Sequence, residues 1–156
     1  MKELDEVMAV LAEIDHLFKD FFNWVAGQYD PVSGGFYYAR SSREDASFQA
    51  DIESTGQAMN IIKDSGLLDG MPDDFRRKAI KFFQERQDPI TGHFLDPHNE
   101  MRTIERLRVR GTNYSVSALN TLGGAPLYPL PGATEDTGAG VPEFMADPQT
   151  YRTWME

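Results

Sequence analysis

Two acidic residues, Asp51 and Glu53, open a predicted helix over Asp51–Ile62. A pair of carboxyl groups can act as general acid and as base or nucleophile, which is the chemistry of glycoside hydrolysis. The same residue types also suit the start of a helix, because an Asp side chain caps N–H groups and a Glu complements the helix dipole. The sequence therefore leaves a catalytic and a capping role open for both.

A second candidate pair, Asp96 and His98, lies in the segment Asp96-Pro97-His98-Asn99-Glu100. An Asp and a His two residues apart can form an acid–base pair or bind a metal weakly, but this spacing matches no strong metal-binding signature. An Asp-Pro turn with a surface His is the alternative. We predict that Asp96 and His98 contact substrate, and we predict no metal site and no cofactor.

The basic residues Arg102, Arg106, Arg108 and Arg110 form a cluster in an acidic chain. Guanidinium groups bind carboxylates and phosphates through paired hydrogen bonds, so an acidic sugar such as a uronate would fit them. Ion pairs with the chain's own carboxylates are the alternative. Of the four, Arg106 and Arg110 are predicted to contact substrate.

Three tyrosines accompany these charges. Tyr37 and Tyr38 lie in the loop before the first predicted inner helix, and Tyr114 opens the second. Tyr rings can stack on sugar rings, while simple packing is the alternative. We predict that all three contact an oligosaccharide.

Composition limits the classes of partner. The chain has 156 residues, no Cys, three His and a net charge of −10. The negative charge argues against nucleic acid and anionic membrane as partners, and the absence of Cys excludes disulfides and thiolate metal sites. No apolar run reaches the roughly 18–20 residues of a membrane span. The first residues do not read as a signal peptide, so a cytoplasmic location is expected.

A seven-residue motif occurs twice and organises the chain. Asp-Pro-Val-Ser-Gly-Gly-Phe spans Asp30–Phe36, and Asp-Pro-Ile-Thr-Gly-His-Phe spans Asp88–Phe94. Pro disfavours helical geometry in the residue before it, so Asp-Pro ends a helix. Gly can supply a positive φ, and the final Phe can return to the core as an anchor. We interpret the motif as a repeated structural turn.

Amphipathic helices flank both copies. A long helix is predicted from about Lys2 to Tyr29, and another from Pro72 through Lys78–Gln87, with inner helices at Asp51–Ile62 and Tyr114–Leu122. Loops are predicted over residues 36–50 and 95–111. The apolar residues of the first helix recur at intervals of three and four: Leu4, Val7, Met8, Leu11, Ile14, Phe18, Phe21, Phe22 and Val25.

The repeat has a period of about 60 residues and divides the chain into three parts. Residues 1–125 hold two helical hairpins, residues 126–143 form a Pro/Gly-rich connector, and residues 144–156 read as the start of a third repeat helix. A chain that ends inside a repeat is expected to leave an open hairpin face.

The stretch with Lys78-Ala79, Phe82-Phe83, Gln87, Gly92 and Phe94 resembles the repeat of squalene–hopene cyclases and related α/α toroids. Two positions depart from that repeat, because Phe83 replaces an aliphatic residue and Phe94 replaces Trp. The resemblance implies an all-α fold of antiparallel helix hairpins from an incomplete α/α toroid. In such a fold the starts of inner helices, including Asp51 and Glu53, rim the central cavity.

The resemblance implies, as the first-ranked function, a part or split version of a carbohydrate-active toroid enzyme of the glycoside hydrolase or polysaccharide lyase type. The alternative is a non-catalytic binding or assembly module, whose exposed hairpin face pairs with itself or another chain. A terpenoid cyclase-like protein ranks third, because the chain lacks the family's protonating Asp-x-Asp-Asp motif.

Overall fold

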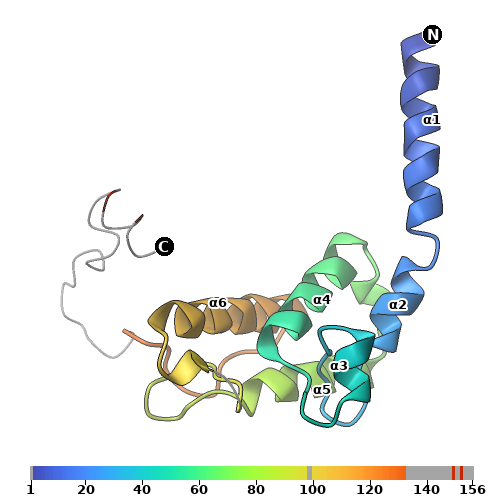
Figure 1. Cartoon of the computed structure of the whole chain (residues 1–156). Coiled ribbons are helices and arrows are strands. Elements are labelled where there is room, and N and C mark those ends of the chain that lie inside the picture. The colour runs from blue at the N-terminus through green and yellow to red at the C-terminus, as the bar shows by residue number, and fades with distance from the viewer. Residues whose placement is uncertain (1, 98–99, 133–148, 150–151, 153–156) are drawn as a thin grey trace.

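The computed structural model describes residues 2–97, 100–132, 149 and 152. The described residues form helices, and β-type pairing among them is limited to isolated bridges at the two repeated turns. The all-α prediction is therefore confirmed (Figure 1). In chain order the elements, with 3-10 helices written η, are α1 (Lys2–Leu17), α2 (Phe21–Gly27), α3 (Arg40–Glu44), α4 (Ile52–Asp64), η1 (Leu68–Gly70), α5 (Asp73–Gln84), η2 (Glu100–Arg102) and α6 (Glu105–Leu122).

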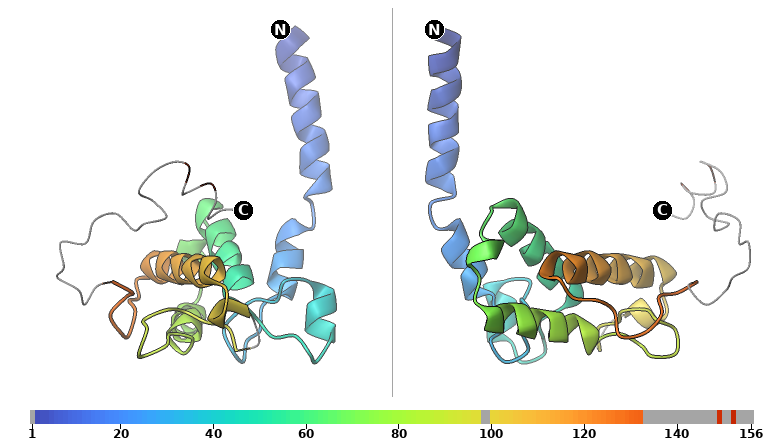
Figure 2. Two further views of the ribbon diagram at one scale, coloured as in Figure 1. Left: turned by 60° about the vertical axis from the view of Figure 1, so that its left-hand side comes forward. Right: turned by 180° about the vertical axis from the view of Figure 1, so that it is seen from behind.

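The helix predicted near the N-terminus is divided in two. Helix α1 ends at Leu17, a turn covers residues 18–20, and α2 begins at Phe21. The N–H of Phe21 donates to the carbonyl of Phe18 at 3.0 Å, and the two rings meet edge to face with their centroids 5.7 Å apart. As a result α1 stands away from the other helices in all views (Figures 1 and 2), whereas α2 buries Val25 in the core.

The repeated motif folds into the same turn twice. The backbone N–H groups of Asp30 and Asp88 donate to the carbonyl five residues further on, at 2.9 and 2.8 Å. Each Asp carboxylate also accepts hydrogen bonds from the two N–H groups that follow the Pro. The predicted left-handed glycines are present, with φ of +84° at Gly34 and +73° at Gly92.

The final Phe of each turn anchors it to an inner helix. The N–H of Phe36 donates to Thr55 Oγ1 at 2.9 Å, and the N–H of Phe94 donates to Thr112 Oγ1 at 3.3 Å. Both Phe side chains are buried. Thr55 lies on α4 and Thr112 on α6, so the two copies use the same connection between turn and inner helix.

The two long loops contain more helix than predicted. Helix α3 lies within residues 36–50, and α6 begins at Glu105, so the loop prediction for residues 105–111 is wrong. The segment Glu105-Arg-Leu-Arg-Val-Arg-Gly111 consists mainly of residues with good helix propensity. Its two apolar side chains, Leu107 and Val109, are partly buried. Helix α6 therefore carries the Arg residues that the sequence assigned to a loop.

Helices α4 and α6 lie side by side and form the centre of the molecule. They pack tightly at Gly56, where an added Cβ would lie 2.8 Å from the ring of Tyr114. Around this pair lies one apolar core, whose members include Val25, Phe36, Ile52, Met59, Ile62, Phe75, Phe82, Phe83, Phe94, Met101, Leu119 and Leu122. The closure of these hairpins into a toroid stays a prediction.

The segment after α6 returns across the second turn. Gln87, which is buried, accepts hydrogen bonds from the N–H groups of Leu127 and Tyr128 at 2.8 and 3.0 Å. Its amide nitrogen donates to the carbonyls of Gly92 and Tyr128. The start of the third repeat helix, including Tyr151, was predicted for residues 144–156, nearly all of which lie outside the described residues.

Candidate functional site

Asp51 caps helix α4. Its backbone is extended, with φ −121° and ψ 163°, and its carboxylate accepts hydrogen bonds from the N–H and the hydroxyl of Ser54, both at 2.7 Å. These are the bonds that the capping interpretation requires. A catalytic role for Asp51 stays a prediction, and its carboxylate oxygens are both engaged.

Glu53, Arg110 and Tyr114 come together on the surface between α4 and α6. Glu53 forms an ion pair with Arg110 and accepts a hydrogen bond from the Gln57 amide at 3.1 Å. The guanidinium of Arg110 lies 5.9 Å from the centroid of the Tyr114 ring, within cation–π range. The structure thus brings three sequence-predicted residues into contact. The charged groups of Glu53 and Arg110 are, however, already paired with each other.

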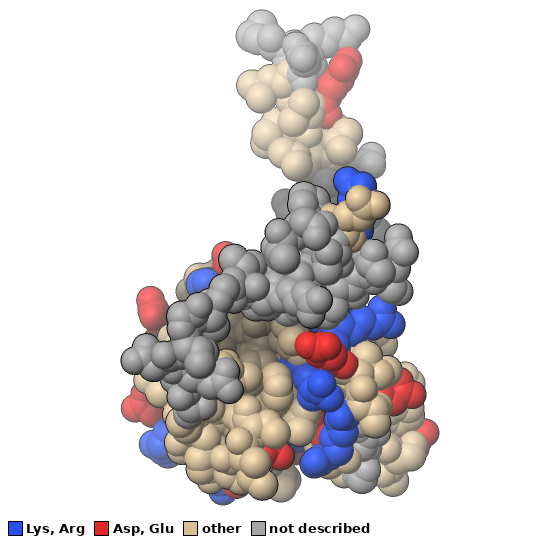
Figure 3. All heavy atoms as spheres, turned by 90° about the vertical axis from the view of Figure 1, so that its left-hand side faces the viewer, with Lys and Arg blue, Asp and Glu red and all other residues tan. Residues whose placement is uncertain are grey.

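The other members of the Arg cluster spread along η2 and α6. Arg108 donates to the carbonyl of Arg102 at 2.9 Å, and Arg106 is exposed. Basic and acidic side chains lie next to one another on the face seen in Figure 3. Pairing with the chain's own carboxylates, the alternative to anion binding, is the arrangement seen for Arg110.

Asp96 lies apart from these residues and inside the molecule. Its carboxylate accepts hydrogen bonds from the N–H of Ile52 at 3.0 Å and from Arg86 Nε at 3.1 Å. Burial raises the pKa of Asp96, and the bonds from Ile52 and Arg86 offset only part of this rise. The pair joins the turn of the second hairpin to the start of α4. His98, its predicted partner, lies outside the described residues.

A shallow hollow of about 300 Å³ lies beside the start of α4. Asp51 and Glu53 both line it, together with the exposed rings of Tyr38 and Phe48. The sequence placed Tyr38 and the two acids at one site, and the structure brings them to one hollow. The sequence analysis did not propose Phe48 as a site residue. An aromatic residue in a polar loop is a signal that could have indicated it.

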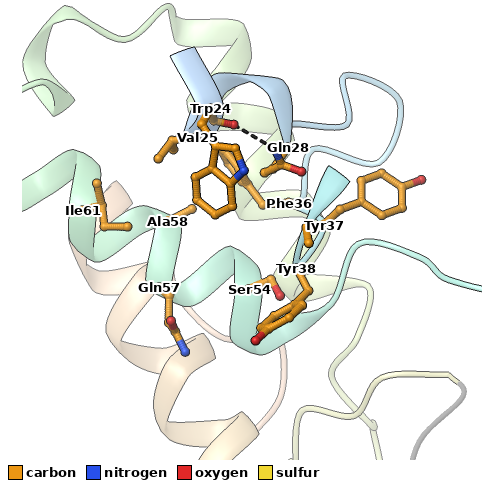
Figure 4. Close-up of a pocket in the computed structure, with 11 residues that line it drawn as sticks. Trp24, Val25, Gln28, Phe36, Tyr37, Tyr38, Ser54, Gln57, Ala58 and Ile61 are labelled. Carbon is orange, nitrogen blue, oxygen red and sulfur yellow. Dashed lines mark hydrogen bonds between the residues drawn. The ribbon is translucent and has the colours of Figure 1, made fainter. Parts of the chain in front are cut away.

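A larger pocket, of about 390 Å³, opens between α2 and α4 (Figure 4). Trp24 of α2 and Gln28, the residue after its end, stand on one side, and Gln57 and Ile61 of α4 stand on the other. Tyr38 lies at its end beside Ser54, whereas the ring of Tyr37 points away from the other labelled side chains. The sequence missed this pocket because only folding brings α2 onto α4.

Gln28 is the unusual group in this pocket. The residue is 5% exposed, and its amide nitrogen donates to the carbonyl of Trp24 at 2.9 Å. Since that carbonyl can only accept, the amide orientation is fixed, and Oε1 faces the other way. Oε1 is buried and accepts no hydrogen bond in the described part of the chain. Most buried polar side-chain atoms have a partner, so this oxygen calls for an explanation.

Helix α1 exposes an apolar surface. Each of its large apolar side chains described from Leu4 to Leu11 is at least half exposed, and Phe18 in the following turn is 57% exposed. By contrast, no large hydrophobic side chain of α5 or α6 is exposed. Among the described helices, α1 therefore carries a run of exposed apolar side chains, whereas Ile90 is exposed singly at the second turn.

Neither a metal site nor a membrane span is found in residues 2–97 and 100–132 or at the two described positions beyond. No group of three or more His, Asp or Glu side chains there is arranged to hold a metal ion. No helix in this part is long and apolar enough to cross a bilayer. Comparison of the chain with family models, curated proteins and solved structures found no match.

Proposed function

We propose that this protein is a helical assembly module that associates through α1 with a second copy of itself. The observation that carries the proposal is the exposed apolar surface of α1, which stands away from the body of the molecule (Figures 1 and 2). A single helix of this length is marginally stable in water, and most helical stability in proteins comes from packing of the apolar face. The apolar side chains of α1 from Leu4 to Leu11 lack such packing in the described part of the chain.

The spacing along α1 favours a copy of the same helix as the partner. Leu4, Val7 and Leu11 alternate at intervals of three and four, which is the a/d pattern of a two-helix seam. In this register Asp5 and Glu6 take positions b and c, away from the seam. Two copies can therefore pair their apolar stripes without placing these like charges against each other.

The apolar area supplies a gain of the same size as the cost of association. Burying a fully exposed Leu, Val or Met side chain stabilises by about 1.5–3 kcal/mol, so a half-exposed one contributes about 1 kcal/mol. Five such side chains from each copy, Leu4, Val7, Met8, Val10 and Leu11, would enter the contact. Their sum of about 10 kcal/mol lies within the association cost of about 4–15 kcal/mol, so the expected dimer is one that dissociates on dilution.

Light scattering after size exclusion, over a range of protein concentrations, tests the proposal. We expect a dimer or larger oligomer that dissociates on dilution. Leu11→Glu places a charge in the seam and should raise the dissociation constant at least about tenfold. Ala9→Glu is the matched control, because it adds the same charge at position f, opposite the seam. A monomer at all concentrations, or equal effects of both variants, would refute the proposal.

A further inference from the structure

We infer that the pocket between α2 and α4 binds a small, neutral, aromatic molecule that carries one N–H or O–H donor. This inference is independent of association through α1, because every residue that lines the pocket lies between Trp24 and Ile61. Its volume of about 390 Å³ falls within the range of small-molecule sites.

The lining determines the charge and polarity of the ligand. No charged side chain lines the pocket, so a neutral ligand is favoured. Ionic ligands would lose their hydration without gaining an ion pair. Most of the walls are apolar or aromatic, formed by Trp24, Val25, Phe36, Ala58 and Ile61. A flat apolar ring would therefore contact complementary surface on both sides.

The remaining polar groups specify a single donor. Ser54 already donates its hydroxyl proton to Asp51 at 2.7 Å, and the Gln57 amide donates to Glu53 at 3.1 Å. Gln28 Oε1 is the buried acceptor that lacks a partner in the described part of the chain. One donor on an aromatic ring matches this buried acceptor.

The Gln28 amide can present this oxygen to a ligand. Oε1 is shielded from solvent, but the terminal torsion of a Gln side chain has a broad minimum. A rotation about that bond turns the oxygen toward the pocket and weakens the donation to the Trp24 carbonyl, a loss that the hydrogen bond to the ligand must outweigh. The hydrogen bond that forms would satisfy an atom that otherwise bears a desolvation penalty in the free protein.

Titration with indole and with benzofuran, followed by ¹H–¹⁵N NMR, tests this inference. The two probes have the same size and shape, but only indole has an N–H donor. We expect shifts at the Gln28 side-chain amide and at the backbone of Ala58 and Ile61. Indole should bind about fivefold or more tightly than benzofuran, which corresponds to one neutral hydrogen bond.

Two variants locate the effect. Gln28→Leu should remove the preference for indole, and Gln84→Leu should retain it, since Gln84 lies on α5 and donates only to the carbonyl of Ala125. Absence of binding by both probes, or equal affinities in the unmodified protein, would overturn the inference without any variant. Binding of methyl glucoside at the same signals, with no response to indole, would overturn the assigned ligand class.

Discussion

Asp96→Ala removes the acceptor that joins the two hairpins. Two donors lose their partner in this variant: the Ile52 N–H, at the first residue of α4, and Arg86 Nε. Both lie in the interior, where Arg86 and Asp96 side chains are 12% and 8% exposed. Water therefore cannot replace the missing carboxylate without disturbing the packing.

The expected loss follows from these two donors. Each buried donor left without a partner costs about 1–3 kcal/mol, so the pair costs about 4 kcal/mol. Arg86 keeps two carbonyl acceptors, those of Phe82 and Ala50, and stacks 3.5 Å from the centroid of the Phe82 ring. These contacts, together with the nearby charges of Glu85 and Asp51, keep part of the compensation that Asp96 supplies, so the Coulomb penalty stays smaller than for an isolated buried charge. For a chain of this size the melting temperature should fall by about 8–16 °C.

Urea unfolding followed by far-UV circular dichroism measures this loss. Asp96→Asn retains an acceptor oxygen and should cost only about 1 kcal/mol. Asp69→Ala is the surface control, because Asp69 is fully exposed and 3.7 Å from Arg76, and it should cost no more than about 0.5 kcal/mol. Equal losses for the Ala and Asn variants at position 96 would refute the reasoning, since they would show that charge and not the acceptor decides.

The pH dependence of the same pair has a defined sign. Burial raises the pKa of Asp96 above its ordinary value of 3.8. Between the two values the folded protein binds more protons at this group than the unfolded chain does, so its contribution to stability falls as the pH rises through that window. The advantage of the unmodified protein over Asp96→Asn should therefore shrink as the pH rises. An advantage that grows across this window would contradict the prediction.

Three further perturbations test other parts of the structure. Gly34→Ala should destabilise the protein by at least about 1 kcal/mol more than Gly66→Ala, as measured by thermal unfolding. Both glycines have positive φ, but only at Gly34 would an added Cβ meet the backbone of Lys78, at 2.5 Å. Burial, and secondly the charge of Arg108, lower the pKa of His93 below its ordinary value of 6.5. The contribution of His93 to stability should therefore be lost as the pH falls below about 6.5, and His93→Gln should flatten the dependence of stability on pH in this range. Gln87→Leu removes four hydrogen bonds of a buried amide and should cost about 2–4 kcal/mol, with increased proteolysis after α6.

Local chemistry made the turns predictable from sequence. The Asp-Pro pairs, the glycines at Gly34 and Gly92, and the Phe anchors all depend on interactions within a few residues. The same is true of Asp51, whose capping bonds reach only to Ser54. Short-range rules were therefore sufficient for these elements.

Long-range contacts were not predictable in the same way. Residues 105–111 have good helix propensity, a local signal that the loop prediction overlooked, and Leu107 and Val109 then take partly buried positions. Arg86 and Asp96 flank the second turn, but Asp96 also accepts from Ile52, 44 positions away in the chain. The pocket at Gln28 likewise exists only once α2 lies on α4. A single sequence shows the residue types but not which distant segments meet.

The segment over residues 127–130 covers the second turn where a helix covers the first. At the first turn, the space beside Gly34 is filled by Lys78 of α5, the outer helix of the next hairpin. At the second turn, the corresponding space beside Gly92 is filled by the carbonyl of Pro129. The segment after α6 thus takes, at the second turn, the place that an outer helix takes at the first. Designs that stack a further outer helix on the second turn must therefore first displace this segment from Gly92.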